Sequence, residues 1–304
     1  MKYTAYKLSF HTGVHFGNGM LNDSKQTFCA DTLFSALCIE ALKQGEGCLE
    51  RLYEMSKEGS LLFSDGFPFI GETLYIPKPL LAVEHNTEDV ANRKKWKNLS
   101  YIPLDRVSEF LSGEMDVEKE TTVFQELGRA ETRQFVNLQK EESEPYSVGV
   151  YHYSGKNGLY FILGYEREEN REFLEEVLGS LEYQGLGGKI SSGLGKFTST
   201  SYKLPEGIIE KMSSQSGRFV VLSTSLPNQT ELGNVMEDAS YLLVKRSGFV
   251  QSSTYAEELV KKKDMYFLRS GSIVCHRYAG DIYNVGTKGS HPVWRYGKPI
   301  LMEV

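Results

Sequence analysis

The residues best suited to binding chemistry lie between Gly185 and Phe197, in the segment GLGGKISSGLGKF. Five glycines, two serines and two lysines occupy these thirteen positions. Glycines let the main chain approach a ligand closely, and consecutive amides can then form a nest for an anion. Lysine adds charge and serine donates hydrogen bonds, so a phosphate backbone is the favoured ligand. The candidate binding residues are Gly187, Gly188, Lys189, Ser191, Ser192, Gly193 and Lys196.

Two common nucleotide-binding motifs do not fit this segment. The pair Gly188-Lys189 is followed by Ile190, and the glycine spacing of a Walker A motif is absent. A P-loop and a dinucleotide-binding turn both run from a strand through a loop to a helix, whereas this loop follows an expected helix and enters an expected strand. The alternative is a loop whose glycines only permit tight packing.

Two histidines near the end of the first expected strand indicate a different chemistry, because histidine can act as an acid or base in RNA cleavage. The sequence shows no second acid-base partner for His11 or His15. His15 and the adjacent Phe16 are also suited to RNA contacts, through hydrogen bonding and base stacking. Both interpretations stay open. The other candidate RNA contacts near this turn are Gly17, Asn18 and Lys25.

The C-terminal third holds further candidate RNA contacts. The segment KRSGF at 245–249 combines charge, a turn and an aromatic ring, which suits a splayed base and its phosphate. In HPVWRYGKP at 291–299, basic residues are phosphate candidates, while the aromatic residues fit the core equally well. The candidate RNA contacts from these two segments are Lys245, Arg246, Phe249 and Arg295.

The sequence predicts neither a metal site nor a bound cofactor. The cysteines at 29, 38, 48 and 275 have neither the paired spacing of a zinc site nor the density of a disulfide-stapled secreted domain. His276 and His291 lie far from any cysteine or carboxylate cluster. We therefore expect reduced, structural cysteines.

Composition and length are those of an ordinary folded protein that does not enter a membrane. The chain has 304 residues, 40% of them hydrophobic and 24% charged, and no apolar run approaches the ~20 residues of a membrane span. The first ten residues alternate between apolar and polar, which favours a strand over a signal peptide. We therefore expect a cytoplasmic protein.

The net charge of −6 hides an uneven distribution along the chain. Residues 1–104 carry 11 basic and 12 acidic side chains, residues 105–182 carry 8 and 18, and residues 183–304 carry 15 and 10. A negative total argues against nucleic acid as a partner, because phosphate binding usually needs a basic surface. A basic C-terminal part with an acidic middle suits a protein that binds phosphates on one face and a protein on another.

Apolar periodicity predicts strands and helices in the first 205 residues. Residues 2–10 alternate like a strand, and apolar residues from Leu33 to Leu42 recur at helical spacing. We expect Asp31 to cap that helix, and a second helix to end at Gly59. Two alternating segments joined by GKNG, YSVGVYHYS and LYFILGY, predict a β-hairpin. A helix over 168–180 and a strand through Tyr202 complete the pattern.

This order predicts an α+β fold with two domains. Residues 1–205 would form an N-terminal ferredoxin-like domain, and residues 206–304 a smaller C-terminal ferredoxin-like domain, with the boundary in a segment rich in proline, glycine and serine. Residues 86–145 are the least periodic stretch, which indicates an insertion or an arm.

The segment GLGGKISSGLGKF resembles the glycine-rich loop of the RAMP (repeat-associated mysterious protein) superfamily of CRISPR proteins. Other segments narrow the resemblance. They are HFGNGMLNDSK followed by CADTLFSALCIEAL, then YLLVKRSGF, and finally GDIYNVGTKGSHPVWRYGKPI. In this order, and over the whole chain, they are similar to the family of fourth Csm proteins of type III-A CRISPR effector complexes.

The resemblance implies a non-catalytic subunit with two ferredoxin-like (RRM-like) domains that binds the 5′ handle of the crRNA and anchors the large Palm-domain catalytic subunit. It also implies contact with the backbone RAMP subunit of the Csm complex, and indirect contact with target RNA, in antiviral defence against foreign RNA and DNA. Members of the family carry a projecting β-hairpin thumb, for which residues 86–145 are the candidate here.

Two other functions stay open at this point. A RAMP endoribonuclease that processes precursor guide RNA would use His11 or His15 and would cleave repeat RNA without a metal. A structural adaptor would assemble with other proteins without contacting RNA.

Overall fold

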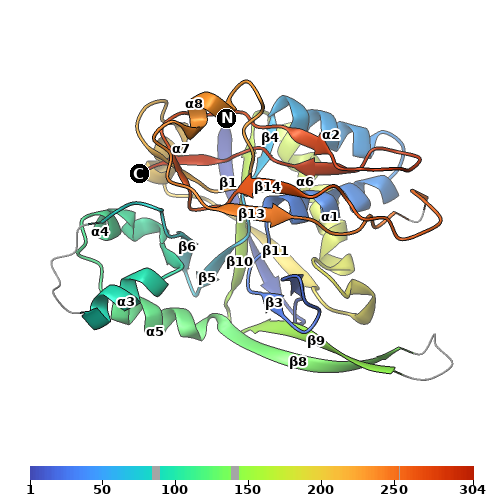
Figure 1. The fold of residues 1–304 in the computed structure, drawn as a ribbon, viewed down its shortest axis with the longest axis horizontal. Helices are drawn as coiled ribbons and strands as arrows, with labels where there is room; N and C mark the ends of the chain where they lie inside the picture. Colours follow the sequence, from blue (N-terminus) through green and yellow to red (C-terminus); the bar gives the residue numbers. More distant parts are fainter. Residues whose placement is uncertain (84–89, 138–143, 253) are drawn as a thin grey trace.

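The computed structural model describes residues 1–83, 90–137, 144–252 and 254–304. Within these ranges a seven-stranded antiparallel sheet lies at the centre (Figure 1). Its order is β11-β1-β10-β5-β6-β7, and β4 also pairs with β10. Its strands are β1 (Lys2–Phe10), β4 (Leu61–Phe63), β5 (Phe67–Ile70), β6 (Thr73–Pro77), β7 (Tyr101–Pro103), β10 (Gly158–Tyr165) and β11 (Phe197–Tyr202). The predicted mixture of helices and strands is confirmed.

The central strands are connected in a β-α-β-β-α-β order. Helix α1 (Ala30–Lys43) follows β1, and α6 (Glu168–Gln184) connects β10 to β11. Across the sheet, the strands stand in the order fourth, first, third and second. Helix α2 (Cys48–Glu58) packs beside α1 and ends at Gly59, as expected from the sequence.

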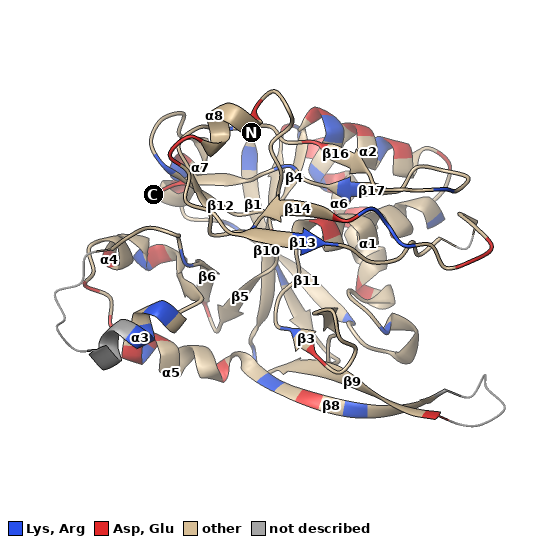
Figure 2. Ribbon diagram, in the orientation of Figure 1, with Lys and Arg blue, Asp and Glu red and all other residues tan. Residues whose placement is uncertain are grey.

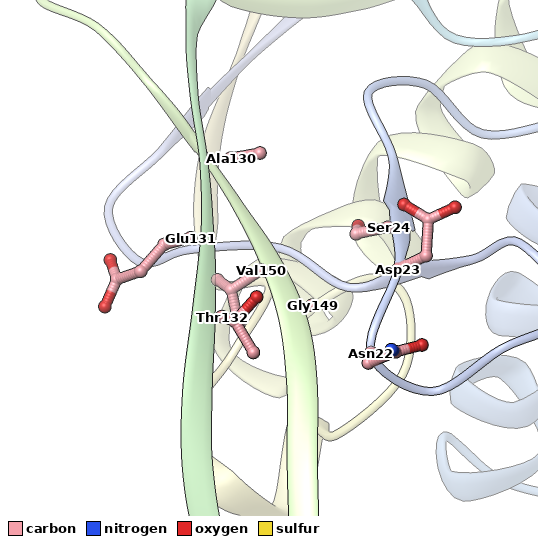
Figure 3. Close-up of a pocket in the computed structure, with 8 residues that line it drawn as sticks. All are labelled: Asn22, Asp23, Ser24, Ala130, Glu131, Thr132, Gly149 and Val150. Carbon is pink, nitrogen blue, oxygen red and sulfur yellow. The ribbon is translucent and has the colours of Figure 1, made fainter.

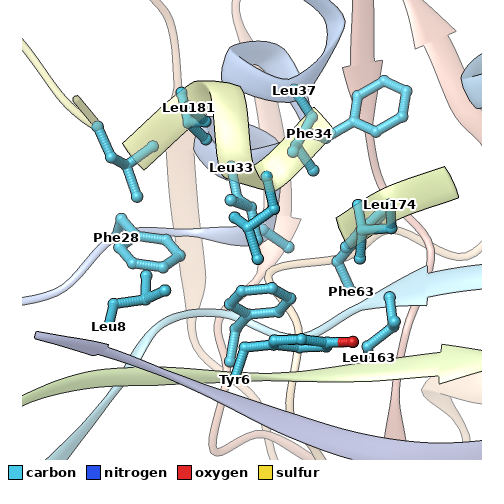
Figure 4. Packing of buried hydrophobic residues seen from close by; sticks show 14 of the residues in the cluster. Tyr6, Leu8, Phe28, Leu33, Phe34, Leu37, Phe63, Leu163, Leu174 and Leu181 are labelled. Atoms are coloured by element: carbon cyan, nitrogen blue, oxygen red, sulfur yellow. The ribbon is translucent and has the colours of Figure 1, made fainter. Parts of the chain in front are cut away.

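The first hydrophobic cluster lies between the sheet and helices α1 and α6. The helical spacing of apolar residues in α1 gives it one buried face, on which Leu33, Phe34 and Leu37 are fully buried. Each such side chain contributes about 1.5–3 kcal/mol by leaving water. Figure 4 shows this packing for Tyr6, Leu8, Phe28, Leu33, Phe34, Leu37, Phe63, Leu163, Leu174 and Leu181.

The opposite face of the sheet packs against the C-terminal part of the chain. One cluster joins Tyr160 and Ile162 of β10 to Val220 and Met302. The expected boundary after residue 205 falls between β11 and α7, but the two parts share this cluster. The C-terminal elements are α7 (Glu206–Ser213), β12 (Phe219–Val221), α8 (Leu232–Met236), β13 (Leu243–Arg246), β14 (Met265–Leu268), β15 (Ile273–Val274), β16 (Ile282–Asn284), β17 (Trp294–Tyr296) and β18 (Leu301–Glu303).

The segment around 86–145 contains more regular structure than its sequence indicates. Trp96 and Phe110 pack against each other in the second cluster, so part of the segment belongs to the body of the protein. Residues 84–89 and 138–143 lie outside the described residues. The helices and strands are α3 (Val90–Asn98), η1 (Leu104–Arg106), α4 (Val107–Leu111), α5 (Val117–Phe124), η2 (Gln125–Leu127) and β8 (Gly128–Asn137).

Strand β8 pairs with β9 (Glu144–Tyr153) over its whole length, and together they form a long ribbon that extends away from the central sheet (Figure 1). The expected hairpin between residues 146–154 and 159–165 is therefore wrong. Strand β10 pairs with β1, β4 and β5 instead. Alternation identifies a strand and its two faces, but it carries no information on which strand lies alongside.

The expected cap of α1 is also wrong. Cys29 is the N-cap residue and makes no capping bond through its side chain. The amide of Ala30 donates instead to Oδ1 of Asp65, 35 residues further along the chain, at 2.8 Å. Asp31 lies in the first turn and accepts hydrogen bonds from Arg246 at 2.9 and 2.7 Å. The carboxylate of Asp65, which is distant in the sequence, thus accepts the hydrogen bond at the start of α1 that was expected to go to Asp31.

We expect Asp65→Ala to lower the free energy of unfolding by about 3 kcal/mol, because it leaves buried donors of Ala30 and Thr224 without an acceptor. Asp116→Ala is the matched control, since Asp116 caps the exposed start of α5 through the amide of Lys119 and should cost only about 1 kcal/mol. Urea unfolding measures both. Equal losses would contradict a special role for Asp65.

The stability contributed by Asp65 should depend on pH. Burial raises the pKa of its carboxyl above the usual 3.8. The folded chain therefore binds this proton at a higher pH than the unfolded chain does. As the pH falls through the folded pKa, proton binding by Asp65 increases the free energy of unfolding. This increase ends below about 3.8, the usual pKa of the group. The difference in unfolding free energy between the wild type and Asp65→Asn should therefore grow towards acid. A constant difference would refute this linkage.

Candidate nucleic-acid interface

The glycine-rich loop begins where α6 ends and returns to the sheet at β11. The amide of Leu186 donates to the carbonyl of Gly195 at 2.9 Å, which closes the loop at its base. At Gly195 φ is +80°, and an added Cβ would lie 2.3 Å from the carbonyl oxygen of Leu186. A short 3-10 turn, η3 (Ile190–Ser192), forms the outer part of the loop and is preceded by Lys189 in a left-handed conformation. The glycines thus allow the backbone conformations and close contacts that this loop requires.

The loop packs against the turn that follows β1. The amide of Gly188 donates to the carbonyl of His15 at 2.8 Å, and the amide of Gly195 donates to the carbonyl of Gly13 at 2.9 Å. This turn contains β2 (Phe16–Gly17) and β3 (Ser24–Lys25), which pair with each other. At Gly187, an added Cβ would lie 2.8 Å from the His15 carbonyl oxygen. Two separate groups of predicted site residues therefore meet in the structure.

The outer part of the loop presents unused hydrogen-bond donors. Within the described part of the chain, no acceptor is recorded for the amides of Gly187, Lys189, Ile190 and Ser191. Three of these amides are consecutive, which is the arrangement of an anion nest. The exposed side chains nearby belong to Ser191, Ser192 and Lys196, while Gly193 turns the chain back towards β11. Consecutive amides without an acceptor are the kind of donors that a phosphate accepts from.

His15 and Phe16 lie in the right place but are buried. Only 7% of His15 is exposed, and its Nδ1 lies 2.7 Å from the carbonyl oxygen of Gly149. Phe16 is 4% exposed and packs against Phe10 and Phe28. Neither side chain offers a free face to a base, so the expectation of stacking on Phe16 and of a side-chain contact from His15 is corrected. Both residues support the loop from beneath.

The remaining candidates of this turn lie at the surface. Gly17 and Asn18 are exposed, and the Asn18 amide donates to Asp23 at 2.5 Å. Lys25 is partly exposed beside Phe16 in the β2–β3 pair. These residues extend the surface of the glycine-rich loop towards α1.

The C-terminal candidates gather at the start of α1 instead of at the loop. Arg246 forms an ion pair with Asp31 at 2.7 Å, and Arg295, which is 4% exposed, donates to the carbonyl of Ser247 at 3.0 Å. Burial lowers the pKa of Arg246, but the charges of Asp31, Cys29 and Asp65 together with the hydrogen bonds to Asp31 raise it above its usual value. Because both guanidinium groups have internal partners, their predicted role as phosphate ligands is corrected to a structural one.

Lys245 and Phe249 of the same segment remain at the surface. Lys245 pairs with Asp264 at 2.8 Å, and Phe249 is 49% exposed. An exposed ion pair of this kind contributes little to stability and leaves the lysine available to solvent.

The β8–β9 ribbon contacts the glycine-rich loop through residues that the sequence did not single out. Nζ of Lys189 lies 3.2 Å from the hydroxyl of Tyr146 and 4.6 Å from the centre of its ring. Leu194 packs against Val148 and Val150 of the same strand. The alternation of residues 144–153 already placed these three side chains on one face of a strand. Only the tertiary structure shows that this face meets the glycine-rich loop.

The ribbon also has charged and hollow regions near its base. Figure 2 shows basic and acidic residues alternating along β8. Glu131 of β8 lies 3.1 Å from Arg133 of the same strand and 3.1 Å from His152 of β9. A hollow of about 130 Å³ lies between the ribbon and the turn before β3, and Figure 3 shows the residues around it. It is lined by Asn22, Asp23, Ser24, Ala130, Glu131, Thr132, Gly149 and Val150.

Two further properties concern the described residues only. In those ranges, no three histidine, cysteine, aspartate or glutamate side chains are grouped so that they could hold a metal ion. In the same ranges, no helix combines the length and apolar character that crossing a bilayer requires.

Comparison with known proteins links both the sequence and the fold to one family. A family model described as the C-terminal domain of CRISPR Csm4 matches residues 214–304. The CRISPR protein Csm4 of Mycobacterium tuberculosis is 32% identical over 290 residues, which cover 95% of this chain and 93% of the relative. Csm4 of Streptococcus thermophilus is 32% identical over 315 residues, which cover 100% and 99%.

Solved structures share the fold over almost the entire chain. A crystal structure of a Csm3–Csm4 subcomplex from a type III-A CRISPR-Cas interference complex contains a chain with a TM-score of 0.69 and 21% identity, covering 100% of this chain and 99% of that one. A Csm1–Csm4 cassette in complex with AMPPNP gives a TM-score of 0.63 and 20% identity, covering 99% and 97%.

Replacing Gly195 with alanine should destabilise the loop and lower the free energy of unfolding by about 1–2 kcal/mol or more, since a left-handed backbone is strained for alanine and the new Cβ meets the Leu186 carbonyl. Gly179→Ala is the matched control, because nothing lies within 4 Å of its added Cβ on α6. There alanine should stabilise the helix by about 0.5–1 kcal/mol. Thermal unfolding compares the two, and a neutral Gly195→Ala would contradict the described loop.

Proposed function

The chain belongs to the Csm4 family of type III-A CRISPR effector complexes, and from this premise we propose that it is the non-catalytic subunit that binds the 5′ handle of the crRNA. The observation that carries the proposal is the glycine-rich loop. Its consecutive unpaired amides, next to Lys189 and the exposed Lys196, offer a site for the phosphates of an RNA strand.

The proposed binding surface runs from this loop to the adjoining turn. Gly188 is hydrogen-bonded to the backbone of His15, and the turn then exposes Gly17 and Asn18 before Lys25. A strand of RNA crossing this surface would meet backbone amides and lysines, while the carboxylate of Asp23 accepts a hydrogen bond from the Asn18 side chain. That arrangement favours contacts with the phosphate backbone over reading of the base edges.

For protein partners, the proposal draws on the solved relatives, which are a Csm3–Csm4 subcomplex and a Csm1–Csm4 cassette. We propose that this chain likewise assembles with a backbone RAMP subunit and anchors the large Palm-domain subunit, in defence against foreign RNA and DNA. Contact with target RNA would then be indirect.

The ribbon of β8 and β9 is the better candidate for the family's thumb. Its paired residues, Gly128–Asn137 and Glu144–Tyr153, form a projecting antiparallel pair, whereas α3 to α5 belong to the body. The β-α-β-β-α-β connection and strand order around β1 support a ferredoxin-like N-terminal domain. A second such domain in the C-terminal part remains part of the proposal.

The guide-processing endoribonuclease has less support. His15 is buried beneath the loop, and the exposed His11 lies 2.5 Å from the hydroxyl of Thr198. The structure records no carboxylate or second histidine beside His11 among the described residues. A single histidine with a threonine is a weak acid-base pair for RNA cleavage.

We expect the purified chain to retain repeat-derived RNA and Lys189→Ala to weaken this binding about tenfold, because a phosphate contact is lost. The slope of log affinity against log salt should fall by about 0.7. Lys203→Ala is the matched control, since Lys203 follows the far end of β11 and its side chain is 83% exposed. Filter binding over a range of salt concentrations measures all three proteins. Equal affinities would remove Lys189 from the site.

The same RNA should remain uncleaved when it is incubated with the chain in the absence of metal. End-labelled RNA on a denaturing gel checks this for the wild type, His11→Ala and His15→Ala. Cleavage that disappears in either histidine variant would replace the scaffold proposal with the processing enzyme.

A further inference from the structure

An aromatic pair lies on the face of the ribbon that meets the glycine-rich loop. Phe135 of β8 and Tyr146 of β9 are directly opposite each other in the register. Their ring centres are 5.8 Å apart and their planes differ by 21°. Both side chains are partly exposed. The partly exposed rings therefore leave some aromatic surface of the ribbon accessible to a ligand.

The two rings adjoin the loop but complete no large core. Inward along the same face come Val148 and Val150, which form a small cluster with Leu194 of the loop. Phe135 and Tyr146 pack on the outer side of this cluster. The cluster fixes the position of the ribbon relative to the loop, while the aromatic pair extends past it.

Lys189 connects this pair to the phosphate site. Its Nζ lies over the ring of Tyr146, 4.6 Å from the centre, and 3.2 Å from the hydroxyl. The amide of Lys189 is one of the consecutive unpaired donors of the loop. A phosphate bound to those donors would therefore lie beside a lysine that already touches the aromatic pair.

The opposite face of the ribbon offers no equivalent. Next to the aromatic pair, this face carries Gln134 opposite Ser147 on one side and the exposed Val136 opposite Pro145 on the other. None of these four side chains is aromatic. On the aromatic face, by contrast, Arg133 supplies a further cation, with 41% of its side chain exposed.

We propose that Phe135 and Tyr146 form a stacking platform for a base of single-stranded RNA, next to the phosphate that Lys189 and the loop amides bind. The inference rests on the proposed function, since it takes the RNA to be present at the loop. Stacking on aromatic rings tolerates any base, so the platform would add affinity and position without selecting a sequence. On binding, the ammonium of Lys189 exchanges the Tyr146 ring for the phosphate, which leaves the ring to the base.

The test uses the full chain and repeat-derived RNAs that carry 2-aminopurine at one position at a time. In the wild type, stacking should quench the fluorescence at one position or at two neighbouring ones. Tyr146→Ala and Phe135→Ala should lose this quenching and weaken binding between about 5-fold and 100-fold. Because no charge is removed, the salt slope should stay that of the wild type, in contrast to Lys189→Ala.

Three variants guard against indirect effects. Tyr146→Phe keeps the ring and should keep the quenching. Phe135→Leu keeps an apolar side chain on the ribbon but should lose the quenching. This variant preserves the test if Phe135→Ala fails to fold. Tyr266→Ala removes a ring that is 56% exposed on β14, away from the ribbon, and should bind and quench like the wild type.

The outcomes separate this inference from the proposed function. If the wild type binds RNA through Lys189 while the aromatic variants bind and quench normally, the platform is refuted and the RNA-binding role stands. If the wild type binds no RNA, both fail. If the aromatic variants retain RNA normally but no longer assemble with the Csm3 and Csm1 partners, the pair belongs to a protein interface and the platform is also refuted.

Discussion

The buried carboxylate of Asp65 joins the two parts of the molecule at one point. It accepts hydrogen bonds from the amide of Ala30 at 2.8 Å, the amide of Thr224 at 2.7 Å and the hydroxyl of Thr224 at 2.8 Å. The first of these donors begins α1, and the other two belong to the C-terminal part. Because a buried charge is costly unless it is fully hydrogen-bonded, these donors are required in this arrangement. The start of α1 is thereby fixed relative to both halves.

A second ionic contact strengthens the same junction. Asp31, one residue into α1, holds Arg246 at 2.7 Å, while Arg295 lies 3.7 Å away. The two arginines come from β13 and β17. These ion pairs fix β13 and β17 relative to the first helix of the N-terminal half. The two arginines therefore have partners within the protein. Two of the basic residues in the C-terminal third are therefore engaged by a carboxylate of the N-terminal half.

The candidate RNA surface depends on another kind of constraint, which is close approach of the backbone. The loop can lie on the turn after β1 only because glycine stands where a Cβ would meet the His15 carbonyl oxygen at 2.8 Å. The ribbon then supports the loop from one side, through Leu194 against Val148 and Val150. Loop, turn and ribbon come from three distant parts of the sequence. A displacement of the ribbon would consequently alter the loop and any strand that it binds.

The sequence alone determined the local elements and the family. Strand β1, the apolar face of α1, the end of α2 at Gly59 and the run of α6 into a glycine-rich loop all follow from short-range periodicity and backbone preference, which need no partner. Pairing and burial were decided by the tertiary structure. Strand β9 pairs with β8 because β10 is occupied on both sides, Asp65 replaces Asp31 at the helix start, and Phe16 and Arg246 are drawn inside. These outcomes depend on contacts between residues far apart in the chain, and a local sequence pattern does not predict such contacts.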